Sequence, residues 1–134
     1  MIVVDSSVVL KWVFDDEDAH EKAIKYRRMH IYGEETIAVP SLFFYEIANV
    51  LATKTKLSTS EAADFFLTFW NFGFEVFDFG LEEFLSGIAL SRQYKTSLYD
   101  AAYIELARRL NCKFITADRR LYKKTKEIKK VGLL

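Results

Sequence analysis

Four acidic residues stand out because carboxylates at their positions could together bind a cation. They are Asp5, Glu46, Asp100 and Asp118. Asp5 directly follows the apolar run 1–4, which is rich in valine and typical of a strand buried on both faces. A charge at the end of such a strand costs free energy unless a partner satisfies it. Carboxylate oxygens are the ligands that Mg²⁺ and Mn²⁺ prefer, so the set predicts a metal site that includes Asp5.

Taken singly, three of these acids have ordinary structural explanations. Glu46 fits the edge of an amphipathic helix, although its spacing of four residues from both Leu42 and Val50 gives it apolar neighbours on one face. Asp100 can interact favourably with the helix dipole, because it lies in the first turn of a predicted helix. Asp118 can be a helix N-cap. A shared site is favoured by where the four stand relative to the predicted strands.

The elements that must position these acids follow from apolar spacing and capping signals. Strands are expected at 1–4, 36–39, 74–77 and 113–116, with an edge strand at 128–133. Helices are expected at 17–30, 42–54, 58–71, 81–94, 98–110 and 118–124. Residues 8–14 are expected to form an apolar connection without regular structure. Ser41 is expected as an N-cap, and Ser58 with Glu61 as a capping box. Strands alternate with helices, singly or in pairs, which predicts an α/β fold with a mainly parallel sheet.

Parallel strands bring the four acids toward one edge of that sheet. Asp5 and Asp118 follow the carboxyl ends of two strands, and Glu46 comes shortly after a third. Asp100 begins a helix that runs antiparallel to the strand it feeds, so it starts at the same edge, where ligands bind in open parallel sheets. Two unit charges ~5 Å apart repel by roughly 3 kcal/mol at an effective dielectric of 20. Four such charges would not all stay ionised without a cation.

Composition narrows the class of protein. The 134-residue chain has 51% hydrophobic residues, which suits one domain over 1–134 with a single core. Its net charge is zero, so it has no global attraction for nucleic acid. The single cysteine, Cys112, cannot form an internal disulfide and suits a reducing cytoplasm. No run approaches the ~20 apolar residues of a membrane span, and no signal peptide is visible, so we expect a cytoplasmic protein away from membranes.

Charge and histidine placement add two expectations. An acidic cluster occupies 15–18, whereas 119–130 is basic apart from Glu127. A basic end can contact phosphates even in a neutral protein, although a solvated helix face is the more common explanation. His20 and His30 fall in one predicted helix and are expected at the surface. No zinc-binding pattern is present.

With these positions in hand, the chain resembles the PIN-domain ribonucleases, and more narrowly the VapC toxins of type II toxin–antitoxin systems. The order and spacing of four short stretches carry the resemblance from end to end. They are 4–7 with 10–12, 40–42 with Glu46 and Asn49, 99–101, and 116–118 with Leu121. No one stretch is specific, whereas the ordered set in a chain of this length is.

The resemblance implies a fold and a chemistry. The fold would be a three-layer α/β/α domain with a five-stranded parallel sheet in the order 3-2-1-4-5. The chemistry would be hydrolysis of RNA phosphodiester bonds with Mg²⁺ or Mn²⁺. The metal would be held by Asp5, Glu46, Asp100 and Asp118. Ligands or water would be oriented by Ser6 or Ser7, Asn49 and Thr116.

The resemblance also implies partners. A small DNA-binding antitoxin would hold the toxin inactive, and the toxin would form a homodimer. The run 65–72 has more aromatic side chains than one helix face can bury, so some are expected at an interface and most in the core. Lys11, Arg119 and Arg120 are candidates for contact with RNA phosphates because of their charge beside the site.

Competing functions fit less well. A phosphatase with an aspartyl nucleophile would need a second aspartate where Ser7 stands, and a dinucleotide-binding domain would need a glycine-rich turn after the first strand. Two alternatives stay open: a PIN-domain RNA-processing nuclease with no antitoxin, and a PIN-like module that binds without cutting.

Overall fold

The computed structural model describes residues 1–14 and 19–134, so the acidic cluster at 15–18 lies outside the described residues. The strands are β1 (Ile2–Val4), β2 (Ile37–Pro40), β3 (Glu75–Phe77), β4 (Lys113–Thr116) and β5 (Val131–Leu133). The helices are α1 (Ser6–Leu10), α2 (His20–Ile31), α3 (Leu42–Thr53), α4 (Thr59–Trp70), α5 (Leu81–Tyr94), α6 (Leu98–Arg109) and α7 (Arg119–Thr125). The five expected strands are all present, within two or three residues of their predicted bounds.

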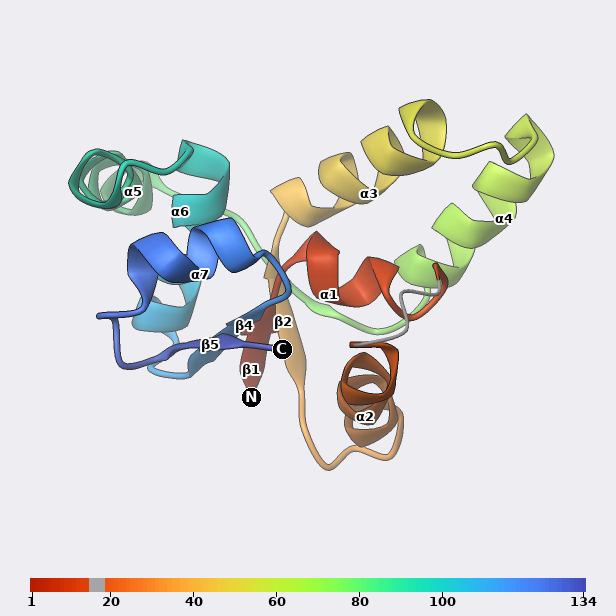
Figure 1. Ribbon diagram of the computed structural model, residues 1–134, viewed down its shortest axis with the longest axis horizontal. Helices are drawn as coiled ribbons and strands as arrows, with labels where there is room; N and C mark the ends of the chain where they lie inside the picture. The colour runs from red at the N-terminus through yellow and green to blue at the C-terminus, as the bar shows by residue number, and fades with distance from the viewer. Residues whose placement is uncertain (15–18) are drawn as a thin grey trace.

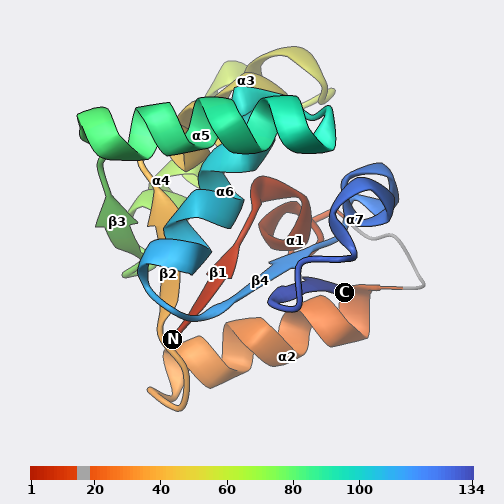
Figure 2. The ribbon, with the colours of Figure 1, turned by 90° about the vertical axis from the view of Figure 1, so that its left-hand side faces the viewer.

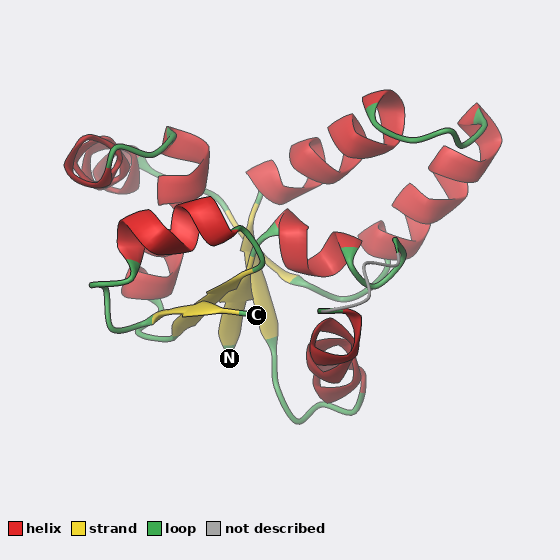
Figure 3. Cartoon of the chain, in the orientation of Figure 1, coloured by secondary structure: helices red, strands yellow, loops and turns green. Residues whose placement is uncertain are grey.

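The strands form one parallel sheet in the order β3-β2-β1-β4-β5, which confirms the order implied by the resemblance. Helices cover both faces, with α1 to α4 on one side and α5 to α7 on the other (Figures 1 and 3). This division follows from right-handed crossovers, because the strand order reverses direction after β3. The central strand β1 is buried along its whole length, and its carboxyl end lies at the switch point beside β4.

Local capping differs from expectation at two places. Residues 8–14 were expected as a connection, but Ser6–Leu10 forms the short helix α1. Asp5 begins this helix by accepting a hydrogen bond from the Val8 backbone N–H at 3.3 Å. Ser41 stands at the N-cap of α3 with helical backbone angles and makes no side-chain capping bond. The expected capping box of Ser58 and Glu61 is confirmed.

Helix α6 carries Asp100, and it is held between the sheet and α5. All seven residues from Ala101 to Ala107 are buried. Buried Glu105 accepts hydrogen bonds from Ser86 Oγ on α5 at 2.8 Å and from Arg108 Nε at 2.9 Å. Gly87 allows close contact, because a Cβ there would lie 3.0 Å from a methyl of Leu98. Figure 2 shows α5 and α6 in front of the strands.

The outward side of α5 is apolar. Leu81, Phe84, Leu85 and Ile88 share one face of α5 and are 48–75% exposed. This happens because α5 meets α6 through its opposite side, where Ser86 and Gly87 lie. We call these four residues the α5 face.

A second apolar surface lies between α3 and α4, where part of the aromatic run 65–72 is found. Phe69 is buried, whereas Trp70 is 59% exposed. Trp70 contacts Phe44 of α3, with ring centroids 4.8 Å apart. The α3–α4 groove, with a volume of about 660 Å³, is lined by Ser41, Phe44, Tyr45, Ala48, Phe66, Trp70, Phe74 and Val76. The aromatic run therefore serves both the core and the surface.

The two histidines were expected to be surface residues, but each of them contacts another segment of the chain. His30 is half-buried and its Nδ1 accepts a hydrogen bond from the Ile37 backbone N–H at 3.1 Å, where β2 begins. Its ring also stacks on Phe72 and Phe74. His20 Nδ1 lies 2.8 Å from the Lys11 carbonyl oxygen. The two rings thus connect α2 to the end of α1 and to the start of β2. Within residues 1–14 and 19–134, no helix has the length and apolar character needed to cross a membrane.

Candidate metal centre

Asp5 lies at the end of β1 and is only 6% exposed. Its two carboxylate oxygens accept hydrogen bonds from two side-chain hydroxyls: Ser7 Oγ donates to Oδ1, and Thr116 Oγ1 donates to Oδ2 at 2.5 Å. We call Ser7 and Thr116 the hydroxyl pair. A buried carboxylate in this setting is oriented from both sides by donors that belong to different parts of the chain.

The backbone of the β4–α7 turn fixes which way these hydroxyls point. The Ala117 N–H donates to Ser7 Oγ at 2.9 Å, and the Asp118 N–H donates to Thr116 Oγ1 at 3.0 Å. Because each hydroxyl accepts a backbone proton, its own single proton is free to be donated to Asp5. Ser7 and Thr116 therefore hold the Asp5 carboxylate between them, and their predicted role toward metal ligands or water stays a prediction.

Glu46 projects from α3 and is half-buried. Its Oε2 accepts a hydrogen bond of 2.5 Å from the Tyr103 hydroxyl of α6, and Ser6 supplies a second side-chain hydrogen bond. No sequence pattern assigned Tyr103, although its spacing of three residues from Asp100 puts it on the same helix face. That shared face is the signal by which it could have been found.

Asp100 stands in the first turn of α6 and is half-buried. Its backbone N–H donates to Ser97 Oγ at 3.0 Å, so Ser97 caps the helix. Its carboxylate Oδ2 accepts a hydrogen bond from Thr96 Oγ1 at 2.9 Å. Asp100 therefore has the ordinary structural role of an acid that interacts favourably with the dipole of its helix. It also adds a negative charge near Glu46.

The charges of these acids act on one another. Burial raises the pKa of Asp5 to about 6 against the opposing hydrogen bonds, and the negative charge of Glu46 adds to the rise. Burial likewise raises the pKa of Glu46, with a further contribution from Asp100. The pKa of Tyr103 is raised well above its ordinary value by burial and by the charges of these three acids, so its hydroxyl keeps its proton. Asp5, Glu46 and Asp100 thus form one electrostatic cluster.

Asp118 is oriented differently. It is exposed, and its Oδ1 accepts hydrogen bonds from the backbone N–H groups of Arg120 at 2.7 Å and Leu121 at 3.1 Å, so it caps α7. Thr116 links its backbone to the carboxylate of Asp5. Within residues 1–14 and 19–134, no three or more His, Cys, Asp or Glu side chains are arranged to hold an ion. The oxygen donors and their mutual repulsion nevertheless fit a hard divalent cation.

The remaining predicted residues lie around this cluster. Asn49 is exposed on α3, one turn after Glu46. Arg119 and Arg120 are exposed at the start of α7, directly after Asp118. Lys11 is half-buried and ends α1. Their predicted roles toward ligands and phosphate stay predictions.

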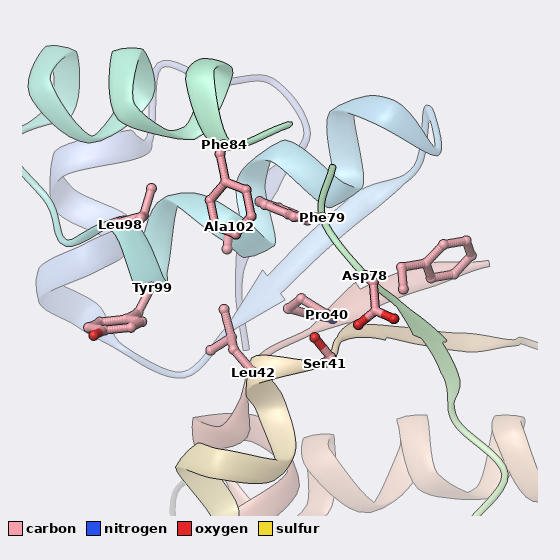
Figure 4. Close-up of a pocket in the computed structure, with 10 residues that line it drawn as sticks. Pro40, Ser41, Leu42, Asp78, Phe79, Phe84, Leu98, Tyr99 and Ala102 are labelled. Carbon is pink, nitrogen blue, oxygen red and sulfur yellow. The ribbon is translucent and has the colours of Figure 1, made fainter. Parts of the chain in front are cut away.

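An apolar pocket of about 360 Å³ adjoins the site without containing it (Figure 4). It opens between the start of α3, the start of α6 and the segment after β3. Leu98 and Tyr99 line it, and Asp100 follows them in the chain. None of the four predicted carboxylates is among its lining residues, so the chemistry of the site lies beside this pocket.

Comparison with known proteins agrees with this architecture. The model of the PIN domain family matches residues 2–127. Ribonuclease VapC3 of Pyrobaculum aerophilum is 28% identical over 128 residues, covering 92% of this chain and 93% of the relative. A toxin–antitoxin complex from Klebsiella pneumoniae superimposes with a TM-score of 0.71 at 14% identity, covering 98% of this chain and 96% of that one. VapBC2 of Rickettsia felis bound to a promoter DNA fragment gives a TM-score of 0.67 at 18% identity, covering 100% and 98%. The chain therefore belongs to the PIN domain family.

Proposed function

We propose that this protein is a metal-dependent ribonuclease and the toxin of a VapBC-type pair, with a single PIN domain over 1–134 and a cytoplasmic location. The observation that carries the proposal is the buried Asp5 carboxylate, oriented by the hydroxyl pair beside Glu46 and Asp100. Support also comes from the similarity to a protein named as a VapC ribonuclease over nearly its whole length.

In this proposal Asp5, Glu46, Asp100 and Asp118 hold Mg²⁺ or Mn²⁺. A bound divalent ion lowers the pKa of a coordinated water and stabilises negative charge on a phosphate. Ser7 and Thr116 keep Asp5 in one orientation, and Ser6 with Asn49 acts on ligands or water near Glu46. Arg119, Arg120 and Lys11 bind phosphates of the RNA chain, in which Arg contributes paired donors and Lys a point charge.

RNA cleavage should require added Mg²⁺ or Mn²⁺ and stop in EDTA. The expected result with purified, antitoxin-free protein is hydrolysis of single-stranded or structured RNA only in the presence of the metal, because the negative charges of Asp5, Glu46 and Asp100 repel a phosphate unless a cation lies between them. The measurement is gel analysis of end-labelled RNA with Mg²⁺, Mn²⁺, Ca²⁺ or EDTA.

Ca²⁺ is the matched metal control because it also prefers oxygen ligands but tolerates looser geometry. Binding of RNA without cleavage in any metal would favour a non-catalytic PIN-like module. Cleavage together with no stable complex with the product of the neighbouring gene would favour an RNA-processing nuclease without an antitoxin. Absence of both RNA and metal binding would end the nuclease proposal.

The two apolar surfaces support the proposed partners. Exposed apolar patches of this kind mark protein interaction sites. We assign the α3–α4 groove to a segment of the antitoxin, since a concave apolar channel suits an inserted amphipathic segment. We assign the α5 face to a second copy of this chain, since a flat helix stripe can pair with itself about a twofold axis.

Two charge substitutions should separate these partners. Tyr45 is 81% exposed in the α3–α4 groove and Leu85 is 58% exposed on the α5 face, so we expect both substituted proteins to fold. Tyr45→Glu is expected to abolish co-purification with the small protein of the neighbouring gene and to keep the dimer. Leu85→Glu is expected to give a monomer, measured by light scattering after size-exclusion chromatography.

Each variant is the control for the other, because both add a glutamate to an apolar surface. A Leu85→Glu protein that stays dimeric would remove the α5 face as the interface. A Tyr45→Glu protein that keeps its antitoxin would do the same for the groove.

A further inference from the structure

Tyr103 is a buried polar residue at the site, and the core holds its ring firmly. The side chain is 1% exposed. Its ring stacks on Phe114, with centroids 5.8 Å apart and planes inclined by 13°. Phe114 belongs to β4 and is the register partner of Val3 in β1. The ring is therefore fixed against the two central strands whose ends form the site.

The hydroxyl of this fixed ring donates a hydrogen bond to Glu46. The bond to Oε2 is 2.5 Å long and joins residues 57 apart in the chain. It connects α6 with α3, two helices on opposite faces of the sheet that meet at the carboxyl edge of the strands (Figure 1). Ser6 provides a second side-chain hydrogen bond to Glu46. An ionised carboxylate has about four acceptor positions, so two hydroxyl donors still leave room for a cation.

We propose that Tyr103 is a positioning residue that holds Glu46 in the orientation from which it binds a divalent cation. The inference rests on the proposed metal-dependent function. A glutamate on a helix has several rotatable bonds, and a ligand free to adopt many rotamers binds a metal less well than one held in place. Groups that orient metal ligands typically change metal affinity or activity 10- to 100-fold when removed.

The competing explanation is that the bond only ties α3 to α6. In that case removing the hydroxyl would lower stability and leave metal affinity unchanged. Tyr103→Phe separates the two, because it keeps the stacked ring and removes one oxygen. Its Mn²⁺ dissociation constant, measured from the paramagnetic resonance signal of free Mn²⁺, is expected to rise by roughly 10- to 100-fold.

The matched control is Tyr26→Phe, which removes the hydroxyl of a half-buried tyrosine on α2 that packs against the core. This control should bind Mn²⁺ within about twofold of the unmutated protein. A Tyr103→Phe protein that also binds Mn²⁺ within twofold would overturn the inference. If the unmutated protein binds no Mn²⁺ and cuts no RNA, the proposed function fails first, and this inference falls with it.

A measurement on the unmutated protein keeps the inference testable if Tyr103→Phe does not fold. A buried hydroxyl proton donated to a carboxylate exchanges slowly and can be followed by proton NMR. The Tyr103 hydroxyl resonance should persist when diamagnetic Mg²⁺ saturates the site, because Glu46 stays bonded while it binds the ion. Its disappearance on Mg²⁺ saturation would show that Glu46 leaves Tyr103 to reach the metal, which contradicts a positioning role.

Discussion

Asp5→Asn is expected to lower RNA cleavage by at least about 100-fold, since even groups that only orient a metal ligand are worth 10- to 100-fold. The substitution keeps the size of the side chain, and its amide oxygen can still accept a hydrogen bond from one member of the hydroxyl pair, but it removes the buried negative charge that would face the cation. Folding should be intact, because a neutral amide at this position avoids the cost of burying a carboxylate. The measurement is the single-turnover cleavage rate at saturating Mn²⁺, together with the circular dichroism spectrum.

Asp64→Asn is the matched control, because Asp64 is an exposed aspartate on α4, outside the carboxylate cluster. It should cleave at the unmutated rate. Cleavage by Asp5→Asn within about tenfold of the unmutated rate would mean that Asp5 is not a ligand of the reacting metal.

The stability of the metal-free protein should fall as pH rises through the range in which Asp5 loses its proton. The pKa of Asp5 is about 6 in the folded chain and 3.8 as the ordinary value. The folded state therefore binds this proton more tightly than the unfolded state does. Relative to the ionised form, protonated Asp5 stabilises the folded state fully below about pH 4, and this stabilisation is lost above about pH 6. The loss amounts to about 3 kcal/mol, at 1.36 kcal/mol for each unit of pKa.

Urea unfolding in EDTA at pH 4 to 8 measures this effect, and Asp5→Asn is the reference that lacks the titrating group. The advantage in stability of Asp5→Asn over the unmutated protein should grow by about 3 kcal/mol across that range. Mn²⁺ at 100 times its dissociation constant should return about 2.7 kcal/mol to the unmutated protein at pH 7. If the difference in the free energy of unfolding between the two proteins did not change with pH, ionisation of Asp5 in the folded state would carry no burial cost.

The parts of the fold that sequence predicts well are those set by local apolar pattern. The run before Asp5 has no polar residue, so a buried strand was the natural interpretation, and the strand at 113–116 followed in the same way. The order of the strands came from the family resemblance. Asp5 itself was identified because a charge directly after such a strand has few structural reasons to be there.

The parts that escaped prediction depend on contacts between distant segments. The bond from Tyr103 to Glu46 joins two helices through side-chain geometry that no spacing rule describes. The exposure of the α5 face depends on which side of α5 meets α6, which the polar contact of Ser86 with Glu105 decides. Asp118 caps α7 through Oδ1, as its ordinary structural explanation allows, and its predicted part in a metal site stays a prediction.

The bonds of the hydroxyl pair also bear on the order in which the site can be completed during protein synthesis. Ser7 bonds to a backbone group 110 residues later, and Asp5 bonds to a side chain 111 residues later. A growing chain that has not yet released β4 from the ribosome has β1 and Ser7, but it lacks Thr116 and the Ala117 N–H that orients the Ser7 hydroxyl. The hydrogen bonds that orient Asp5 are thus complete only when almost the whole chain has been made, so we expect a prematurely ended chain to cleave no RNA.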